Sequence, residues 1–115
     1  MKLLLAEDSE ELLEIMTELF QLVGYDVMIA ETGLDAINLI RNDIPDVIVL
    51  DVNLPLASGF EVLKFLRQQD GGQDTKAIIF SGDTLAKDDP QVALADIFLD
   101  KPVDIQVLLN AVQSS

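Results

Sequence analysis

The chain has 115 residues, of which half are hydrophobic, a formal net charge of −14, and neither histidine nor cysteine. This length and composition predict one folded domain with one core, and no apolar run is long enough to span a membrane or to serve as an export signal. The negative charge excludes nucleic acid or an anionic membrane as a partner held by bulk electrostatics. Because the chain has no export signal and no cysteine, we expect a cytoplasmic protein, and because it has no histidine, we expect any bound metal to prefer oxygen ligands.

The first part of the chain predicts two strand–helix units. Residues 2–6 (KLLLA) read as a short apolar strand, and residues 9–23 as a helix with apolar side chains at helical spacing. Gly24 ends this helix, and residues 26–30 (DVMIA) predict the second strand. A capping pair then opens a helix that ends near Arg41. The apolar positions of the first helix are Leu12, Met16, Leu19, Phe20 and Val23, and the capping pair is Thr32 and Asp35.

The second part continues the alternation. After Pro45, four branched apolar residues run as a third strand into Asp51. Ser58 and Glu61 form another capping pair, which opens a helix to about Gln69. The remaining elements are a strand over 76–81 (KAIIFS), a strand over 97–100 (IFLD) and a helix that Asp104 caps, with Ile105, Leu108, Leu109 and Val112 on its apolar face.

The segment between the fourth and fifth strands is expected to hold little helix. Pro90 cannot lie inside a helix, and Asp89 before it has the chemistry of an N-cap. We therefore predict residues 82–89 as a loop, followed by a short helix from Pro90 to about Ala95.

The order of elements predicts an α/β fold. Strands that are apolar on both faces and alternate with helices form a parallel sheet with helices on both faces. Right-handed crossovers then favour a doubly wound, five-stranded sheet with the flavodoxin-like strand order 2-1-3-4-5, and here its fourth helix is shortened. We expect residues 1–115 to form a single domain.

Polar residues follow the strand ends. In such a sheet a ligand binds outside the carboxyl ends of the strands. Those ends carry two carboxylates after strand one, a third carboxylate at the end of strand three, a hydroxyl and an ammonium. Three carboxylates in a partly desolvated crevice repel, so either a pKa is raised or a cation is bound. Oxygen ligands alone indicate Mg²⁺, and a lysine and a serine suit phosphate oxygens. The residues are Glu7, Asp8, Asp51, Ser81 and Lys101.

These motifs, taken together and in order, resemble the receiver domain of response regulators, the phosphoacceptor domain of two-component signalling. The resemblance covers the whole chain. It is carried by Glu7-Asp8, the run VIVLDVNLP over 47–55, SGFEVL over 58–63, Ser81 and FLDKP over 98–102.

The resemblance implies a phosphoacceptor and a metal site. Asp51 would take a phosphoryl group from the phosphohistidine of a histidine kinase or histidine phosphotransfer protein. Glu7, Asp8, Asp51 and the backbone carbonyl of Asn53 would hold Mg²⁺, and the Lys101–Pro102 peptide bond would be cis. Phosphoryl transfer needs positioning and charge neutralisation more than acid–base chemistry, so the lack of histidine is no obstacle.

The resemblance also implies a switch. Lys101 and Ser81 would bind phosphoryl oxygens, and Phe98 would be the aromatic residue that moves inward when Ser81 is drawn toward the phosphate. Asn53 and Asp83 would tune a slow autodephosphorylation. The protein would be mainly a signalling phosphoacceptor that assists its own phosphorylation and dephosphorylation.

Other functions stay open at this point. A flavodoxin-like electron carrier shares the fold, but the loop EDSE over 7–10 would repel a flavin phosphate. A Mg²⁺-dependent aspartyl-phosphate hydrolase would place a second aspartate where this chain has Asn53. A receiver that docks without transferring phosphate is the third alternative. The chain stops after the last predicted helix, so we expect no effector domain in it, and its output is not readable.

Single residues also have plainer readings. Asp8 with Glu11 reads as a capping box, and Ser81 as the start of a turn. Phe98 could belong to the core, and Lys101 could be a surface lysine.

Overall fold

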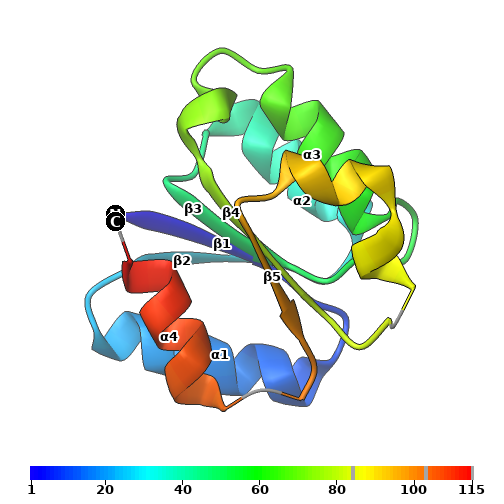
Figure 1. The fold of residues 1–115 in the computed structure, drawn as a ribbon. Coiled ribbons are helices and arrows are strands. Elements are labelled where there is room, and N and C mark those ends of the chain that lie inside the picture. The colour runs from blue at the N-terminus through cyan, green and yellow to red at the C-terminus, as the bar shows by residue number, and fades with distance from the viewer. Residues whose placement is uncertain (84, 103, 115) are drawn as a thin grey trace.

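The chain folds into a sheet between two helix layers (Figure 1). A computed structural model describes residues 1–83, 85–102 and 104–114. The strands are β1 (Lys2–Ala6), β2 (Asp26–Ala30), β3 (Val47–Leu50), β4 (Lys76–Ser81) and β5 (Ile97–Asp100). The α-helices are α1 (Glu10–Leu22), α2 (Gly33–Asn42), α3 (Gly59–Arg67) and α4 (Ile105–Gln113), and the 3-10 helices are η1 (Gly72–Asp74), η2 (Ala86–Asp88) and η3 (Pro90–Leu94).

The sheet has the predicted order, β2-β1-β3-β4-β5, and all its neighbouring strands are parallel. Its register decides which residues meet at the carboxyl edge. Ala6, the last residue of β1, is paired with Leu50, the last residue of β3. Glu7 and Asp51 therefore leave the sheet side by side.

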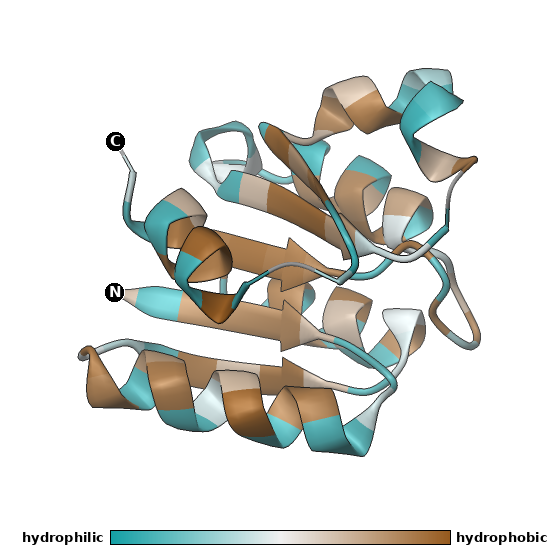
Figure 2. Cartoon of the chain, turned by 60° about the horizontal axis from the view of Figure 1, so that its bottom comes forward, coloured by the Kyte–Doolittle hydropathy of each residue, from teal (hydrophilic) through white to brown (hydrophobic). Residues whose placement is uncertain are grey.

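The two faces of the sheet build two cores. One core joins the sheet to α1 and α4, and the other joins it to α2 and α3. Strand β3 is buried along its whole length because Val47 and Val49 enter one core while Ile48 and Leu50 enter the other. Figure 2 shows the strands as apolar and the outward sides of the helices as mainly polar. None of the helices in the described ranges is long and apolar enough to cross a membrane.

The helices begin at the predicted capping residues, with one correction. Ser58 and Glu61 form a complete capping box, with two hydrogen bonds of 3.2 Å. At α1 the cap is Ser9, whose hydroxyl accepts from the Leu12 N–H at 3.4 Å. The reading of Asp8 as the cap is therefore wrong, because the helix starts one residue later than that reading requires.

The predicted apolar face of α1 also needs correction. Leu13 is buried although the prediction omitted it, and Val23 is exposed. Leu13 lies on the same side of the helix as Met16 and Phe20, three and seven residues further on, and all three enter the core beneath the sheet. Val23 is past the last turn of the helix, as its C-cap.

The connection from β4 to β5 differs in detail from the prediction. Residues 82–89 were expected as a loop, but η2 forms inside this range. The expected short helix after Asp89 is the 3-10 helix η3, and Asp89 caps it as predicted by accepting from the Gln91 N–H at 2.9 Å. The described residues of this connection thus contain two short 3-10 turns and no α-helix.

One arginine fastens this connection to the rest of the fold. The Arg67 side chain, on the last residue of α3, donates to the carbonyl oxygens of Leu94, Gly72 and Thr75 at 3.0, 2.8 and 2.7 Å. Its guanidinium also lies 3.3 Å from the Asp96 carboxylate, which in turn accepts from a backbone N–H of β4. Arg67 therefore joins α3, η1 and η3 at one point.

The loop from β3 to α3 is held on both sides. The Gly33 N–H at the start of α2 donates to the Pro55 carbonyl at 3.0 Å, and a Cβ at Gly33 would collide with the Ala57 carbonyl. A Cβ at Gly59 would collide with the backbone carbonyl of Asp51, the residue that follows β3. Between these contacts Leu56 adopts φ of 69°, a conformation that costs a residue with a side chain about 1–2 kcal/mol.

Candidate site at the carboxyl edge of the sheet

The functional side chains are positioned by backbone hydrogen bonds that continue the sheet beyond its strands. Each bond links the residue after one strand to the last residue of a neighbouring strand. They join Glu7 to Ala30, Asp51 to Ala6 and Lys101 to Ser81, with N–O distances of 3.0, 3.0 and 2.8 Å. The three side chains therefore start from rigid strand ends rather than from free loops.

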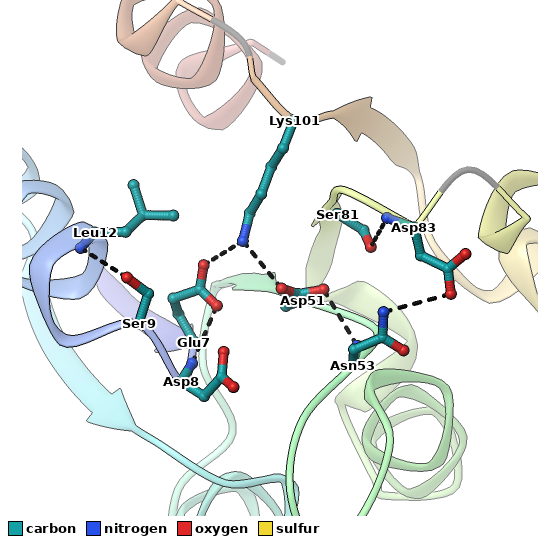
Figure 3. A network of polar contacts seen from close by, with 9 residues as sticks. All are labelled: Glu7, Asp8, Ser9, Leu12, Asp51, Asn53, Ser81, Asp83 and Lys101. Carbon is teal, nitrogen blue, oxygen red and sulfur yellow. Dashed lines mark hydrogen bonds and ion pairs between the residues drawn. The ribbon is translucent and has the colours of Figure 1, made fainter.

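Lys101 lies between two buried carboxylates (Figure 3). Its ammonium donates to Asp51 Oδ2 at 3.0 Å and to Glu7 Oε1 in a short contact. The side chains of Glu7 and Asp51 are 3% and 11% exposed, and that of Lys101 is 23% exposed. The reading of Lys101 as a surface lysine is therefore wrong, because its charge compensates two carboxylates that water barely reaches.

Burial and ion pairing set the pKa values of this pair. Burial raises the pKa of Glu7, and the bond from Lys101 only partly opposes that effect. Burial also acts to lower the pKa of Lys101, but its bonds to Glu7 and Asp51 outweigh this and raise the pKa above the usual lysine value. Lys101 therefore stays charged.

The same edge has a donor set that fits a hard cation. Carboxylate oxygens of Glu7, Asp8 and Asp51 all lie within 4.8 Å of one another. Asp8 is exposed and the other two are buried, so an ion could enter from the solvent side. With only oxygen donors, the set suits Mg²⁺ rather than a metal that prefers nitrogen or sulfur.

A second chain of contacts crosses the site on the side away from Glu7. The Asn53 N–H donates to Asp51 Oδ1 at 3.2 Å, and its side-chain amide donates to Asp83 Oδ2 at 3.4 Å. The Asp83 N–H donates to the Ser81 hydroxyl oxygen at 3.1 Å. Ser81 is fully buried and does begin a turn, so its plainer reading is confirmed, while its role at the site stays a prediction. These contacts join the loops that follow β3 and β4 (Figure 3).

Two further expectations concern β5 and the residue that follows it. Phe98 is half-buried and packs against the core on the α2–α3 face. That placement is compatible both with an ordinary core residue and with an aromatic residue that moves, so its switching role stays a prediction. The Lys101–Pro102 peptide bond is cis, as expected.

Sequence reasoning missed two contacts of the site. It brought Glu7 and Lys101 to one edge of the sheet but did not pair them, although the opposite charges of two long side chains at that edge were an available signal. It gave Asn53 and Asp83 a shared role in dephosphorylation but did not predict their hydrogen bond, although both are polar residues two positions beyond a functional side chain.

Comparison with known proteins identifies the family. A model of the response regulator receiver domain matches residues 3–113. The chain is a response regulator receiver domain. Among curated proteins, the receiver domain is similar to the polar-differentiation response regulator DivK of Brucella anthropi, with 26% identity over 113 residues, which are 96% of this chain and 92% of DivK.

Solved structures agree on the fold. The receiver domain superposes on the chemotaxis response regulator CheY4 of Vibrio cholerae with a TM-score of 0.88 and 30% identity, covering 97% of this chain and 95% of that one. It is also similar to the response regulator TrrA of Thermotoga maritima, whose structure is a complex with Mg(2+)-BeF. That match has a TM-score of 0.87 and 26% identity and covers 97% of this chain and 96% of TrrA.

Proposed function

We propose that residues 1–115 form one receiver domain, which accepts a phosphoryl group on Asp51. The observation that carries the proposal is the position of the Asp51 carboxylate. It is nearly buried, is held by Lys101 at 3.0 Å and the Asn53 N–H at 3.2 Å, and lies beside two further carboxylates. Burying a carboxylate costs free energy, and such groups with strong charge partners are concentrated at functional sites.

The proposed donor is the phosphohistidine of a histidine kinase or a histidine phosphotransfer protein. An Asp51 carboxylate oxygen attacks phosphorus, a P–O bond forms and the P–N bond to the imidazole breaks. The imidazole nitrogen keeps the electron pair of that bond and takes a proton from solvent. The product on Asp51 is an acyl phosphate, and attack of water on its phosphorus returns the carboxylate and inorganic phosphate.

The residues that would hold Mg²⁺ are Glu7, Asp8, Asp51 and the backbone carbonyl of Asn53. The close approach of three carboxylates supports this set. When bound, the ion would supply positive charge to the phosphoryl oxygens during transfer. Asp8, which is exposed, gives the set an open side toward solvent.

Lys101 and Ser81 are proposed to bind phosphoryl oxygens. Lys101 already pairs with the acceptor oxygen, so a phosphoryl group on Asp51 would draw the same ammonium outward and away from Glu7. Ser81 is linked to Asp83 by a backbone bond, and its hydroxyl proton can turn toward an oxygen on Asp51.

The conformational switch would follow from the hydrogen bond between the Asp83 N–H and the Ser81 hydroxyl oxygen. If Ser81 moves toward the phosphate, its bond to the Asp83 N–H breaks, and the connection over 81–89 changes shape together with Phe98. Asn53 and Asp83 would set how fast water reaches the acyl phosphate, because their side chains are hydrogen-bonded to each other beside Asp51 (Figure 3). The output partner would bind the changed conformation of the connection between β4 and β5.

The direct experiment is intact-protein mass after incubation with acetyl phosphate, with and without Mg²⁺, for the wild type and Asp51→Asn. We expect a Mg²⁺-dependent phosphoryl adduct on the wild type and none on the variant. A wild type that takes up no phosphoryl group from acetyl phosphate or from any phosphohistidine protein would show that the domain only docks.

A further inference from the structure

The backbone of Leu56 is strained without benefit to the fold. Among the described residues, Leu56 alone combines a side chain with a positive φ, of 69°. Glycine or asparagine adopts this conformation more readily. The Leu56 side chain is 78% exposed, so it adds almost nothing to the core. A strained backbone that presents an apolar side chain to solvent points to a binding role.

The neighbours of Leu56 impose this conformation. The Pro55 carbonyl accepts from the Gly33 N–H at 3.0 Å and from the Ala57 N–H at 2.8 Å, which fixes the chain on both sides of Leu56. The Gly59 N–H is fixed in turn by the Val52 carbonyl at 2.8 Å. The backbone of Leu56, and with it the direction of its Cα–Cβ bond, is therefore fixed before any partner arrives.

The surface around Leu56 is neutral in a strongly acidic chain. Residues 52–60 (VNLPLASGF) contain no charged residue, although 24% of the whole sequence is charged. This uncharged segment begins directly after Asp51. A partner that covers this segment therefore removes water from no charged side chain of the segment itself.

A second exposed leucine lies on the next connection. Leu85 is 75% exposed and its N–H donates to Asp83 Oδ1 at 2.9 Å. The other oxygen of the same carboxylate accepts from the Asn53 side chain. One carboxylate therefore ties the connection that bears Leu85 to the loop that bears Leu56, and both follow strands that run in the same direction (Figure 2).

We propose that Leu56 and Leu85 form an apolar rim on which the phosphohistidine-bearing donor protein docks. This inference rests on the proposed function and names how its partner is held. The donor must bring phosphorus into contact with Asp51, so its surface covers the adjacent loops. Exposed leucines become buried there, and a pre-fixed Leu56 binds with little loss of conformational freedom. A small phosphodonor reaches Asp51 without touching either leucine.

The test compares a protein donor with a small donor. The variants are Leu56→Asn, Leu85→Asn and the matched control Leu22→Asn, whose leucine is 84% exposed at the far end of α1. The small donor is acetyl phosphate. The protein donor is the member of a panel of purified, autophosphorylated histidine kinases and phosphotransfer proteins that phosphorylates the wild type fastest.

We expect Leu56→Asn to lower kcat/KM for the protein donor about tenfold or more, and Leu85→Asn to lower it about fivefold, as loss of a buried apolar contact predicts. With acetyl phosphate all variants label within about twofold of the wild type, and Leu22→Asn is unchanged with both donors. Because asparagine accepts a positive φ, Leu56→Asn keeps or raises the melting temperature, which a structural role for Leu56 would not allow.

Each other result has a distinct meaning. Wild-type transfer to both rim variants from the protein donor overturns the rim, as does an equal loss with both donors, which would mean that the site itself is damaged. Labelling of the wild type by acetyl phosphate but by no protein in the panel also overturns it. No labelling by any donor contradicts the proposed function instead.

Discussion

The Lys101 ammonium is 3.0 Å from the Asp51 carboxylate although fifty residues separate the two in the chain. The same ammonium contacts Glu7, so one cation compensates two anions that are nearly inaccessible to water. The lysine thus supplies, in the unphosphorylated protein, positive charge to a cluster of anions, and a bound Mg²⁺ would add to that positive charge.

Replacing Lys101 by methionine should destabilise the protein. Removing one partner of a buried ion pair costs about 3–5 kcal/mol, and we expect about 2 kcal/mol here because the Lys101 side chain is 23% exposed. Urea unfolding at pH 7 measures the loss. Lys64→Met, on the exposed side of α3, is the control and should leave the free energy of unfolding unchanged.

The loss should also depend on pH. Burial raises the pKa of Glu7, so above the ordinary glutamate range the folded protein holds a proton on Glu7 that the unfolded chain has released. The stability that this proton supplies is complete at low pH and disappears as pH rises through the raised pKa. In Lys101→Met the pKa of Glu7 should be raised further, because the opposing ammonium is gone. The difference in free energy of unfolding between this variant and the wild type should therefore become smaller as the pH falls. A gap that is constant from pH 4 to pH 8 would contradict the pairing.

Mg²⁺ should stabilise the wild type through the carboxylate cluster. A ligand that binds only the folded state at about a hundred times its Kd adds about 2.7 kcal/mol to the free energy of unfolding. We expect the melting temperature to rise with Mg²⁺ in the wild type and much less in Asp8→Asn. Glu14→Gln, an exposed change on α1, should respond like the wild type. An equal rise in all three proteins would place the ion elsewhere.

A methyl group at Gly59 should displace the backbone of Asp51, the proposed phosphoacceptor. A Cβ there would collide with the backbone carbonyl of Asp51, so Gly59→Ala must move either α3 or the acceptor. We expect a loss of about 1–3 kcal/mol in stability together with slower labelling by acetyl phosphate. Gly82→Ala places its methyl 3.7 Å from Lys101 and should change neither quantity. Normal labelling of Gly59→Ala would show that the acceptor does not depend on this packing.

Asn53 and Asp83 should act as one unit in dephosphorylation. Their side chains are hydrogen-bonded, so removal of either one leaves the other without that contact. We expect Asn53→Ala and Asp83→Ala each to change the rate of acyl-phosphate loss by about two- to tenfold, and the double variant to change it no further than the larger single effect. Decay of the phosphorylated mass with time gives all three rates. Effects that multiply would mean that the two residues work independently.

Arg67→Met should loosen the connection between β4 and β5. Three carbonyl oxygens lose a charged donor, which we expect to cost about 2 kcal/mol or more. Amide exchange should accelerate most at Ala95, whose N–H closes η3. Exchange that rises evenly over all strands would indicate general destabilisation rather than release of η3.

Much of the fold was predictable because local signals agreed with one another. Strands β1, β2, β4 and β5 have the predicted bounds, since each is an apolar run closed by a polar residue or a glycine. The capping serine and threonine residues fixed where α2 and α3 begin. The convergence of Glu7, Asp51 and Lys101 followed from parallel topology alone.

What could not be predicted depends on contacts between distant segments. Nothing in the local sequence of Leu56 indicates a positive φ, because Gly33 and Gly59 impose it from other elements. The partners of Arg67 are backbone carbonyls, which carry no sequence signal. Asp89 and Pro90 predicted where the helix after them begins, but they did not predict its 3-10 geometry.

The Arg67 contacts have a consequence for how this protein can vary. Apart from Asp96, Arg67 binds main-chain oxygens, and every amino acid supplies the same oxygen. The hydrogen bonds of Arg67 therefore do not depend on which side chains η3 carries. Substitutions at Gln91 or Ala93, both exposed, can change what a partner meets without releasing the segment. A receiver domain with this arrangement can gain a new binding partner through single substitutions in η3, because the contacts of Arg67 that hold the segment stay the same.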